Sequence, residues 1–179
     1  MKERIASLVG PDRAQSLWMG TFHSLFNRIL RQEAKLLDFN SNYTIYQPSD
    51  CKSLVNAILK EMGLDNKVYK PGTVCGKISE AKNALILPDE YMADTETYQR
   101  DKKQSLSEMG QIYARYVARM HQANAMDFDD LLLYTYLLFE HYPDVKCKYA
   151  ARFHYILVDE YQDTNYAQHE ILRLFVGRK

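Results

Sequence analysis

The chain has 179 residues, of which 46% are hydrophobic and 26% charged, a composition typical of a folded, soluble protein rather than a disordered or collagen-like one. No apolar run approaches the roughly 18 residues of a membrane span, and the 23 basic and 23 acidic residues balance to a formal net charge of +0, which does not indicate a polyanionic partner. The N-terminus lacks the apolar region of a signal peptide. Cys51, Cys75 and Cys147 have no zinc-site spacing and fit free thiols, so we expect a cytoplasmic protein with no membrane partner.

Helical periodicity dominates the chain. Met109, Ile112 and Tyr116, for example, recur at intervals of three and four residues and fall on one face of a helix. Tyr113 lies in the same stripe, which favours core packing over base stacking for both tyrosines. The pattern predicts helices over residues 24–37, 50–62, 77–85, 105–123 and 127–140. Residues 87–104 are rich in acidic side chains and irregular, so we expect a long, solvated loop there.

Two short apolar runs interrupt the helical pattern. Residues 155–158 are continuously apolar, as in a strand buried on both faces of a parallel sheet, and residues 17–22 form a second run. Two strands alone do not make a stable parallel sheet. The sequence therefore predicts a mainly helical fold with two short parallel-type strands that belong to an incomplete α/β core.

Acidic residues follow the second of these runs. Asp159 and Glu160 come directly after residues 155–158, where ligands bind in open α/β sheets. Adjacent carboxylates at that edge can hold a hard cation and activate water. A simple acidic turn is the alternative, but Gln162 and Asp163 continue the polar pattern and favour a functional segment.

Three segments carry a resemblance to a known family. Residues 158–165 read Val-Asp-Glu-Tyr-Gln-Asp-Thr-Asn and resemble the Walker B motif of the UvrD/Rep/PcrA-type superfamily 1A DNA helicases. Residues 20–24, Gly-Thr-Phe-His-Ser, resemble the single-strand DNA-contacting motif of that family, and residues 127–132, Asp-Phe-Asp-Asp-Leu-Leu, are similar to a third family segment. All three occur in the family's order, and the resemblance covers essentially the whole chain.

The resemblance implies a division of the chain. Residues 1–38 would be part of motor domain 1A, residues 39–125 the inserted helical subdomain 1B, and residues 126–179 the return to domain 1A through Walker B. The two strands would then belong to an incomplete RecA-like core. On this basis the chain is an internal fragment of an ATP-dependent DNA helicase that translocates on single-stranded DNA, unwinds duplex DNA and acts in processes such as DNA repair.

The resemblance also implies residue roles in the intact helicase, which would use ATP and Mg²⁺. Asp159 would hold Mg²⁺, commonly through water, and Glu160 would polarise the attacking water. Gln162 and Asp163 would couple the nucleotide site to the neighbouring core. The partners would be single-stranded DNA, duplex DNA and the rest of the helicase polypeptide. The expected DNA-contacting residues are Thr21, Phe22, His23, Arg28 and Arg31.

One motif that such an ATPase needs is absent from the sequence. Residues 72–78, Gly-Thr-Val-Cys-Gly-Lys-Ile, come nearest to the phosphate-binding pattern Gly-x-x-x-x-Gly-Lys-Ser/Thr. They have one residue too few between the glycines, Ile78 replaces the hydroxyl residue, and no apolar strand precedes them. We therefore expect the isolated chain to bind no ATP or Mg²⁺ and to be inactive as an ATPase.

Several candidate residues also have a simpler structural explanation. His23 suits a helix cap or a core position, and Phe22 suits the core. Asp129 and Asp130 suit the first turn of a helix, where acidic side chains interact favourably with the helix dipole. Isolated basic residues on helices are usually solvated, although four of them could contact a DNA backbone: Lys77, Lys82, Arg28 and Arg31.

Two other functions remain open at this point. The chain could be a non-enzymatic DNA-binding or protein-interaction module that keeps the strand signature as architecture. It could also belong to the helicase arm of an AddA/RecB-like nuclease, which shares Walker B. An upstream phosphate-binding motif in the same reading frame would favour the helicase.

Overall fold

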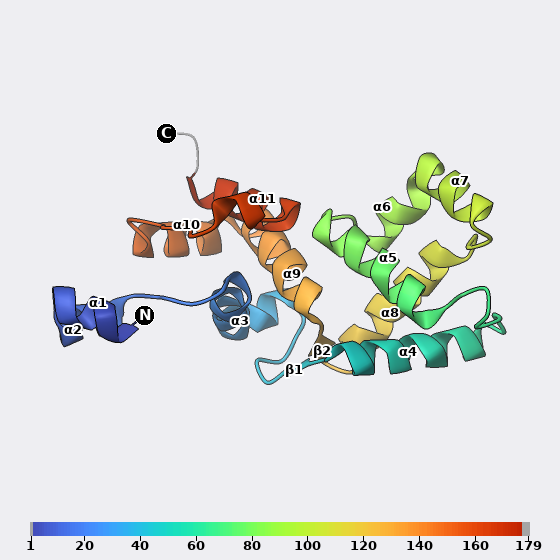
Figure 1. Ribbon diagram of the computed structural model, residues 1–179, viewed down its shortest axis with the longest axis horizontal. Helices are drawn as coiled ribbons and strands as arrows, with labels where there is room; N and C mark the ends of the chain where they lie inside the picture. Colours follow the sequence, from blue (N-terminus) through green and yellow to red (C-terminus); the bar gives the residue numbers. More distant parts are fainter. Residues whose placement is uncertain (1, 177–179) are drawn as a thin grey trace.

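Helices make up most of the chain in the computed structural model, which describes residues 2–176 (Figure 1). In chain order they are α1 (Lys2–Val9), α2 (Pro11–Ser16), α3 (Phe22–Glu33), α4 (Pro48–Glu61), α5 (Pro71–Asn83), α6 (Pro88–Ala93), α7 (Thr95–Lys103), α8 (Met109–Gln122), α9 (Phe128–His141), α10 (Pro143–Arg152) and α11 (Tyr166–Val176). The shorter elements are the 3-10 helices η1 (Ala34–Leu37) and η2 (Tyr161–Asp163) and the strands β1 (Thr44–Ile45) and β2 (Ala125–Met126). The prediction of a mainly helical fold is confirmed.

Local sequence signals explain where the helices begin. Proline opens α4 and α5 at Pro48 and Pro71, where its missing N–H costs nothing. Helix α9 begins with a reciprocal cap: the Asp130 N–H donates to Asp127 Oδ1 at 2.8 Å, and the Asp127 N–H donates to Asp130 Oδ2 at 3.0 Å. Within residues 2–176, none of these helices combines the length and the apolarity needed to cross a bilayer.

The prediction of a loop over residues 87–104 is wrong, because this segment forms α6 and α7. The acidic residues that suggested solvation act as caps. The Leu87 N–H donates to Glu90 Oε2 at 2.8 Å at the start of α6, and the Glu96 N–H donates to Asp94 Oδ1 at 3.0 Å at the start of α7. Asp101 is buried and pairs with Lys77 at 2.8 Å. Lys77 is thus in an ion pair in the interior of α5, neither at a helix start nor solvated.

The predicted positions of the strands are also wrong. Residues 17–20 and 155–158 form no strand, and Phe22 already belongs to α3. The two strands are instead β1 and β2, which pair in parallel with Thr44 opposite Ala125. The apolar run 155–158 has no neighbouring strand among residues 2–176, so Leu157 is 96% exposed. A buried strand needs hydrogen-bonding partners on its flanks, and here the run lacks them.

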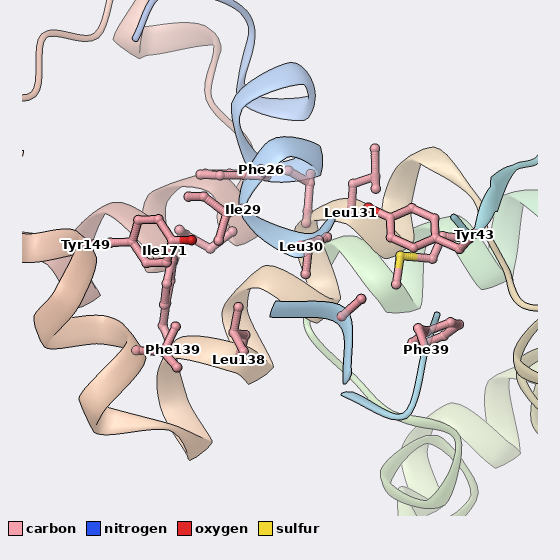
Figure 2. Packing of buried hydrophobic residues seen from close by; sticks show 14 of the residues in the cluster. Phe26, Ile29, Leu30, Phe39, Tyr43, Leu131, Leu138, Phe139, Tyr149 and Ile171 are labelled. Carbon is pink, nitrogen blue, oxygen red and sulfur yellow. The ribbon is translucent and has the colours of Figure 1, made fainter. Parts of the chain in front are cut away.

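Buried side chains gather in two clusters. The helices that carry them occupy different parts of the molecule (Figure 1). We call the first the α3–α9 cluster; it joins α3 and α9 with α10 and α11, and Figure 2 shows its packing. Its buried members are Phe26, Ile29, Leu30, Ala34, Phe39, Tyr43, Met126, Leu131, Leu132, Leu138, Phe139, Val145, Tyr149, Ala167 and Ile171.

The second, which we call the α4–α8 cluster, lies within α4 to α8 and the residues around them. It contains Tyr113 and Tyr116, so the prediction that these tyrosines pack in the core is confirmed. Its buried members are Val55, Ile58, Leu59, Tyr69, Val74, Ile78, Ala81, Tyr91, Leu106, Met109, Ile112, Tyr113, Tyr116, Met120 and Ala125.

A buried ion cluster connects the α3–α9 cluster to the α4–α8 cluster. Lys82, from α5, is completely buried, and its Nζ lies 2.7 Å from both Asp127 Oδ2 and Asp130 Oδ1 at the start of α9. The Tyr116 hydroxyl of α8 donates to Asp127 Oδ2 at 2.9 Å. We call these four residues the Lys82 cluster. The expectation that Lys82 is solvated or contacts DNA is wrong, since its ammonium is enclosed by two carboxylates.

Protonation in the Lys82 cluster follows from burial and attraction. Burial lowers the pKa of Lys82, but attraction by Asp130 and Asp127 outweighs burial and raises that pKa above its ordinary value. Burial raises the pKa of Asp130 to about 7. Lys82 therefore stays charged at neutral pH and needs its partners, because an unpaired buried charge is very costly.

We predict that Lys82→Met destabilises the fold strongly. The substitution keeps the side-chain volume but leaves the buried carboxyl groups of Asp127 and Asp130 without their cation, and removing one partner of a buried pair costs about 3–5 kcal/mol. Urea unfolding followed by circular dichroism measures the loss. Lys60→Met, at an exposed position of α4, is the matched control and should leave stability unchanged. Equal stability of the two variants would contradict the role of the Lys82 cluster.

Candidate functional site

The first candidate surface is the N-terminal end of α3. Thr21 is exposed and caps the helix, since its Oγ1 accepts from the Ser24 N–H at 3.3 Å and its carbonyl accepts from the Ser24 hydroxyl at 2.9 Å. The cap on this helix is therefore Thr21 rather than His23. Phe22 is half-buried, and its ring lies 5.7 Å from that of Phe26 in the α3–α9 cluster. An exposed hydroxyl at a helix N-terminus can meet a phosphate.

An aromatic pair of one exposed and one half-buried ring lies beside this helix start. The ring centroids of His23 and Phe128 are 6.0 Å apart, and the rings meet edge to face at 79°. Phe128 comes from the first turn of α9 and is 41% exposed. Sequence reasoning did not single out Phe128, although it lies in the segment 127–132 that carries the resemblance. Two motif segments far apart in the chain thus place aromatic rings together, where a nucleobase could stack.

The two arginines of α3 have partners within the protein. The Arg28 guanidinium carbon lies 4.0 Å from the centre of the Trp18 ring. Arg31 donates to the carbonyls of Ser41 at 2.6 Å and Tyr43 at 3.1 Å, and its guanidinium also lies over the Tyr43 ring. Arg31 therefore holds the turn before β1. A DNA contact by either arginine stays a prediction.

The second candidate surface is the acidic segment, which we define as residues 159–163. Asp159, Glu160 and Asp163 are all exposed. Asp159 Oδ1 accepts from the Glu160 N–H at 3.0 Å, and the Gln162 side-chain amide donates to Glu160 Oε2. Glu160 has a φ of 50°, a left-handed conformation that few residues other than glycine adopt. Within residues 2–176, no three acidic, histidine or cysteine side chains come together in an arrangement that could hold a metal ion.

Asn165 connects the acidic segment to the helices. Its side-chain amide donates to Asn83 Oδ1 at 2.6 Å, and the Asn83 amide in turn donates to Asp129 Oδ1 at 2.8 Å. Asn83 ends α5, and Asp129 lies in the first turn of α9. Residues 128 and 129 are adjacent, so the same helical turn contacts the first candidate surface and is linked to the second. Sequence reasoning gave neither asparagine a role, although Asn165 ends the segment 158–165 that carries the resemblance, because asparagine is not a residue type that signals catalysis.

Comparison with known proteins identifies the family. Residues 1–179 match the UvrD/REP helicase N-terminal domain, and the chain belongs to this family. It is 41% identical over 178 residues to the ATP-dependent DNA helicase UvrD1 of Mycobacterium leprae (strain TN), a match that covers 99% of this chain and 22% of the relative. It is 39% identical over 178 residues to the ATP-dependent DNA helicase PcrA of Staphylococcus aureus (strain Mu50 / ATCC 700699), covering 99% of this chain and 23% of the relative. The chain therefore spans less than a quarter of the length of these relatives.

Proposed function

We propose that the chain is part of an ATP-dependent DNA helicase that translocates on single-stranded DNA and separates the duplex. The family match over the whole chain supports this, as do relatives that are named ATP-dependent DNA helicases. The observation that carries the proposal is the first turn of α9, which contacts His23 through Phe128 and is linked through Asp129 to the acidic segment. A motor that couples nucleotide hydrolysis to DNA movement needs such a connection between its two sites.

The proposed division is residues 1–38 and 126–179 in motor domain 1A and residues 39–125 in subdomain 1B. The α4–α8 cluster supports it, because all its buried members lie between residues 55 and 125, whereas Phe39 and Tyr43 of the proposed subdomain 1B pack in the α3–α9 cluster. The rest of the helicase polypeptide would supply strands beside residues 155–158. Tyr155 and Leu157, which are 90% and 96% exposed, would become buried there.

In the proposed nucleotide site, Asp159 would hold Mg²⁺, and Glu160 would polarise the attacking water. Mg²⁺ in phosphate-binding sites commonly takes one or two carboxylates and keeps several waters, with phosphates as further ligands. The single exposed carboxylate of Asp159 fits this arrangement. The Gln162 amide donates to Glu160 and would help orient the Glu160 carboxylate. Asp163 would couple the site to the neighbouring core.

The proposed DNA surface consists of the N-terminal end of α3 and the aromatic pair. Thr21 and the first two N–H groups of α3 would meet a phosphate. His23 and Phe128 would stack on a base in a way that tolerates any sequence, as a translocating protein requires. Arg28 and Arg31 would add phosphate contacts if DNA displaces their present partners.

We predict that the isolated chain does not hydrolyse ATP. The residues that come nearest to a phosphate-binding loop, 72–78, lie in α5, where the N–H groups from Val74 onward bond within the helix. The phosphate ligands of a P-loop are therefore missing. Phosphate release from ATP, with and without oligothymidylate, measures this. DNA-stimulated turnover that Glu160→Gln abolishes would contradict the proposed location of the nucleotide site.

We predict that the isolated chain binds single-stranded DNA weakly, without sequence preference and through the aromatic pair. The slope of log affinity against log salt should be about −0.7 for each phosphate contact. Phe128→Ala should weaken binding by about 1–3 kcal/mol if a base stacks on the ring, and His23→Ala should also weaken it. Fluorescence anisotropy with labelled oligothymidylate at two salt concentrations measures both effects.

A matched control separates binding from stability. Tyr98→Ala removes another exposed helical aromatic ring, 45% exposed and located on α7, and should leave DNA affinity unchanged. Phe22→Ala should lower both the melting temperature and the affinity, because its ring also packs on Phe26. Arg31→Ala should mainly lower the melting temperature. If Phe128→Ala and His23→Ala change only the melting temperature, the DNA surface lies elsewhere.

A further inference from the structure

Asn83 joins two segments that are far apart in the sequence. Its side-chain amide donates to Asp129 Oδ1 at 2.8 Å and to the Ser79 carbonyl at 2.9 Å. Its Oδ1 accepts from the Asn165 amide at 2.6 Å. The orientation of the Asn83 amide follows from these partners, since both acceptors lie at the nitrogen and the donor lies at the oxygen. Asn83 is half-buried, so these bonds are partly shielded from water.

The two polar ends of the Asn165 side chain have separate partners. The Asn165 Oδ1 accepts from the Gln168 backbone N–H at 2.9 Å, and the Asn165 backbone N–H donates to Gln168 Oε1 at 3.0 Å. These two bonds cap the start of α11. Within residues 2–176, the Asn165 side-chain nitrogen donates only to Asn83. Asn165 lies two residues after Asp163, the last residue of the acidic segment. A change at the nitrogen can therefore remove the connection and keep the cap.

The connection ends at a turn that is itself held firmly. Asp129 lies between Phe128, whose ring contacts His23, and Asp130, which pairs with Lys82. Because Lys82 is completely buried, the start of α9 has little freedom to move relative to α5. The acidic segment is exposed, and apart from bonds within itself and its neighbours it is held to α11 by the Tyr161 hydroxyl, which lies 2.6 Å from His169 Nδ1.

We propose that Asn83 and Asn165 are positioning residues that hold the acidic segment in place relative to the first turn of α9. The candidate nucleotide segment and the candidate DNA surface then move as one unit. Neither asparagine touches nucleotide or DNA in this arrangement; each acts through the segment that it holds. The functional meaning of the two surfaces rests on the proposed helicase function, whereas the contact itself does not.

Asn165→Asp is the most selective test. Aspartate caps a helix as well as asparagine does, but it has no amide to donate to Asn83. We expect the backbone N–H groups of Asp163 and Thr164, which bond to Glu160 and Tyr161, to exchange with water about three- to tenfold faster, the range for losing one hydrogen bond. NMR exchange measurements on the 179-residue chain give these rates.

A second variant and a control make the test specific. Asn83→Ala should accelerate exchange at the same amides, and the double variant should exchange no faster than either single one, because all remove the same contact. Asn56→Ala, which removes an exposed helical asparagine that contacts Asn66 in a loop, should have no effect at Asp163. If wild type and the Asn83 and Asn165 variants exchange equally there, the positioning contact is overturned.

DNA gives a readout that a purely structural role would not change. In wild type, oligothymidylate bound at the aromatic pair should slow exchange at Asp163 and Thr164. In Asn165→Asp this response should disappear while the melting temperature and DNA affinity stay the same. A response that persists in Asn165→Asp would overturn the positioning role. If the wild-type chain binds no DNA but the variants still exchange faster at Asp163 and Thr164, the proposed DNA surface is overturned and the contact stands.

Discussion

A buried ammonium determines how the α3–α9 cluster and the α4–α8 cluster meet. Lys82 has no access to solvent, and the Asp127 and Asp130 carboxylates both lie 2.7 Å from its Nζ. Leaving one of these charges without its partner inside the protein would cost several kcal/mol. The start of α9 must therefore stay against α5, and the α3–α9 and α4–α8 clusters are joined at this point.

The candidate sites depend on this constraint because of helix geometry. Neighbouring residues of a helix point in different directions, since one turn takes 3.6 residues. In the first turn of α9, Asp130 faces Lys82, Phe128 meets His23, and Asp129 bonds to Asn83. One turn fixed by a buried charge thus positions the aromatic pair on one side and a hydrogen-bonded link to the acidic segment on another.

The sequence predicts well what depends on neighbouring residues and poorly what depends on distant ones. Periodicity located α3, α4, α5, α8 and α9 but missed the other six α-helices of residues 2–176. The motif segments indicated the family that the comparison then showed. The run 155–158 reads as a strand, but a strand forms only beside partners, and none lies next to it in residues 2–176. Residues 87–104 look solvated because capping acids resemble surface acids. Lys82 and Asn165 find partners 45 and 82 positions away, which no local pattern reveals.

Native-state hydrogen exchange at Asp127 and Asp130 tests most directly whether the Lys82 cluster joins the two halves. Both N–H groups donate to the buried carboxylates of the cap. We predict that they exchange only through global unfolding, with the same denaturant dependence as the amides of Leu59 in the α4–α8 cluster and Leu138 in the α3–α9 cluster. Exchange at Asp127 and Asp130 through a local opening, at a free energy well below that of Leu59 and Leu138, would contradict this central role.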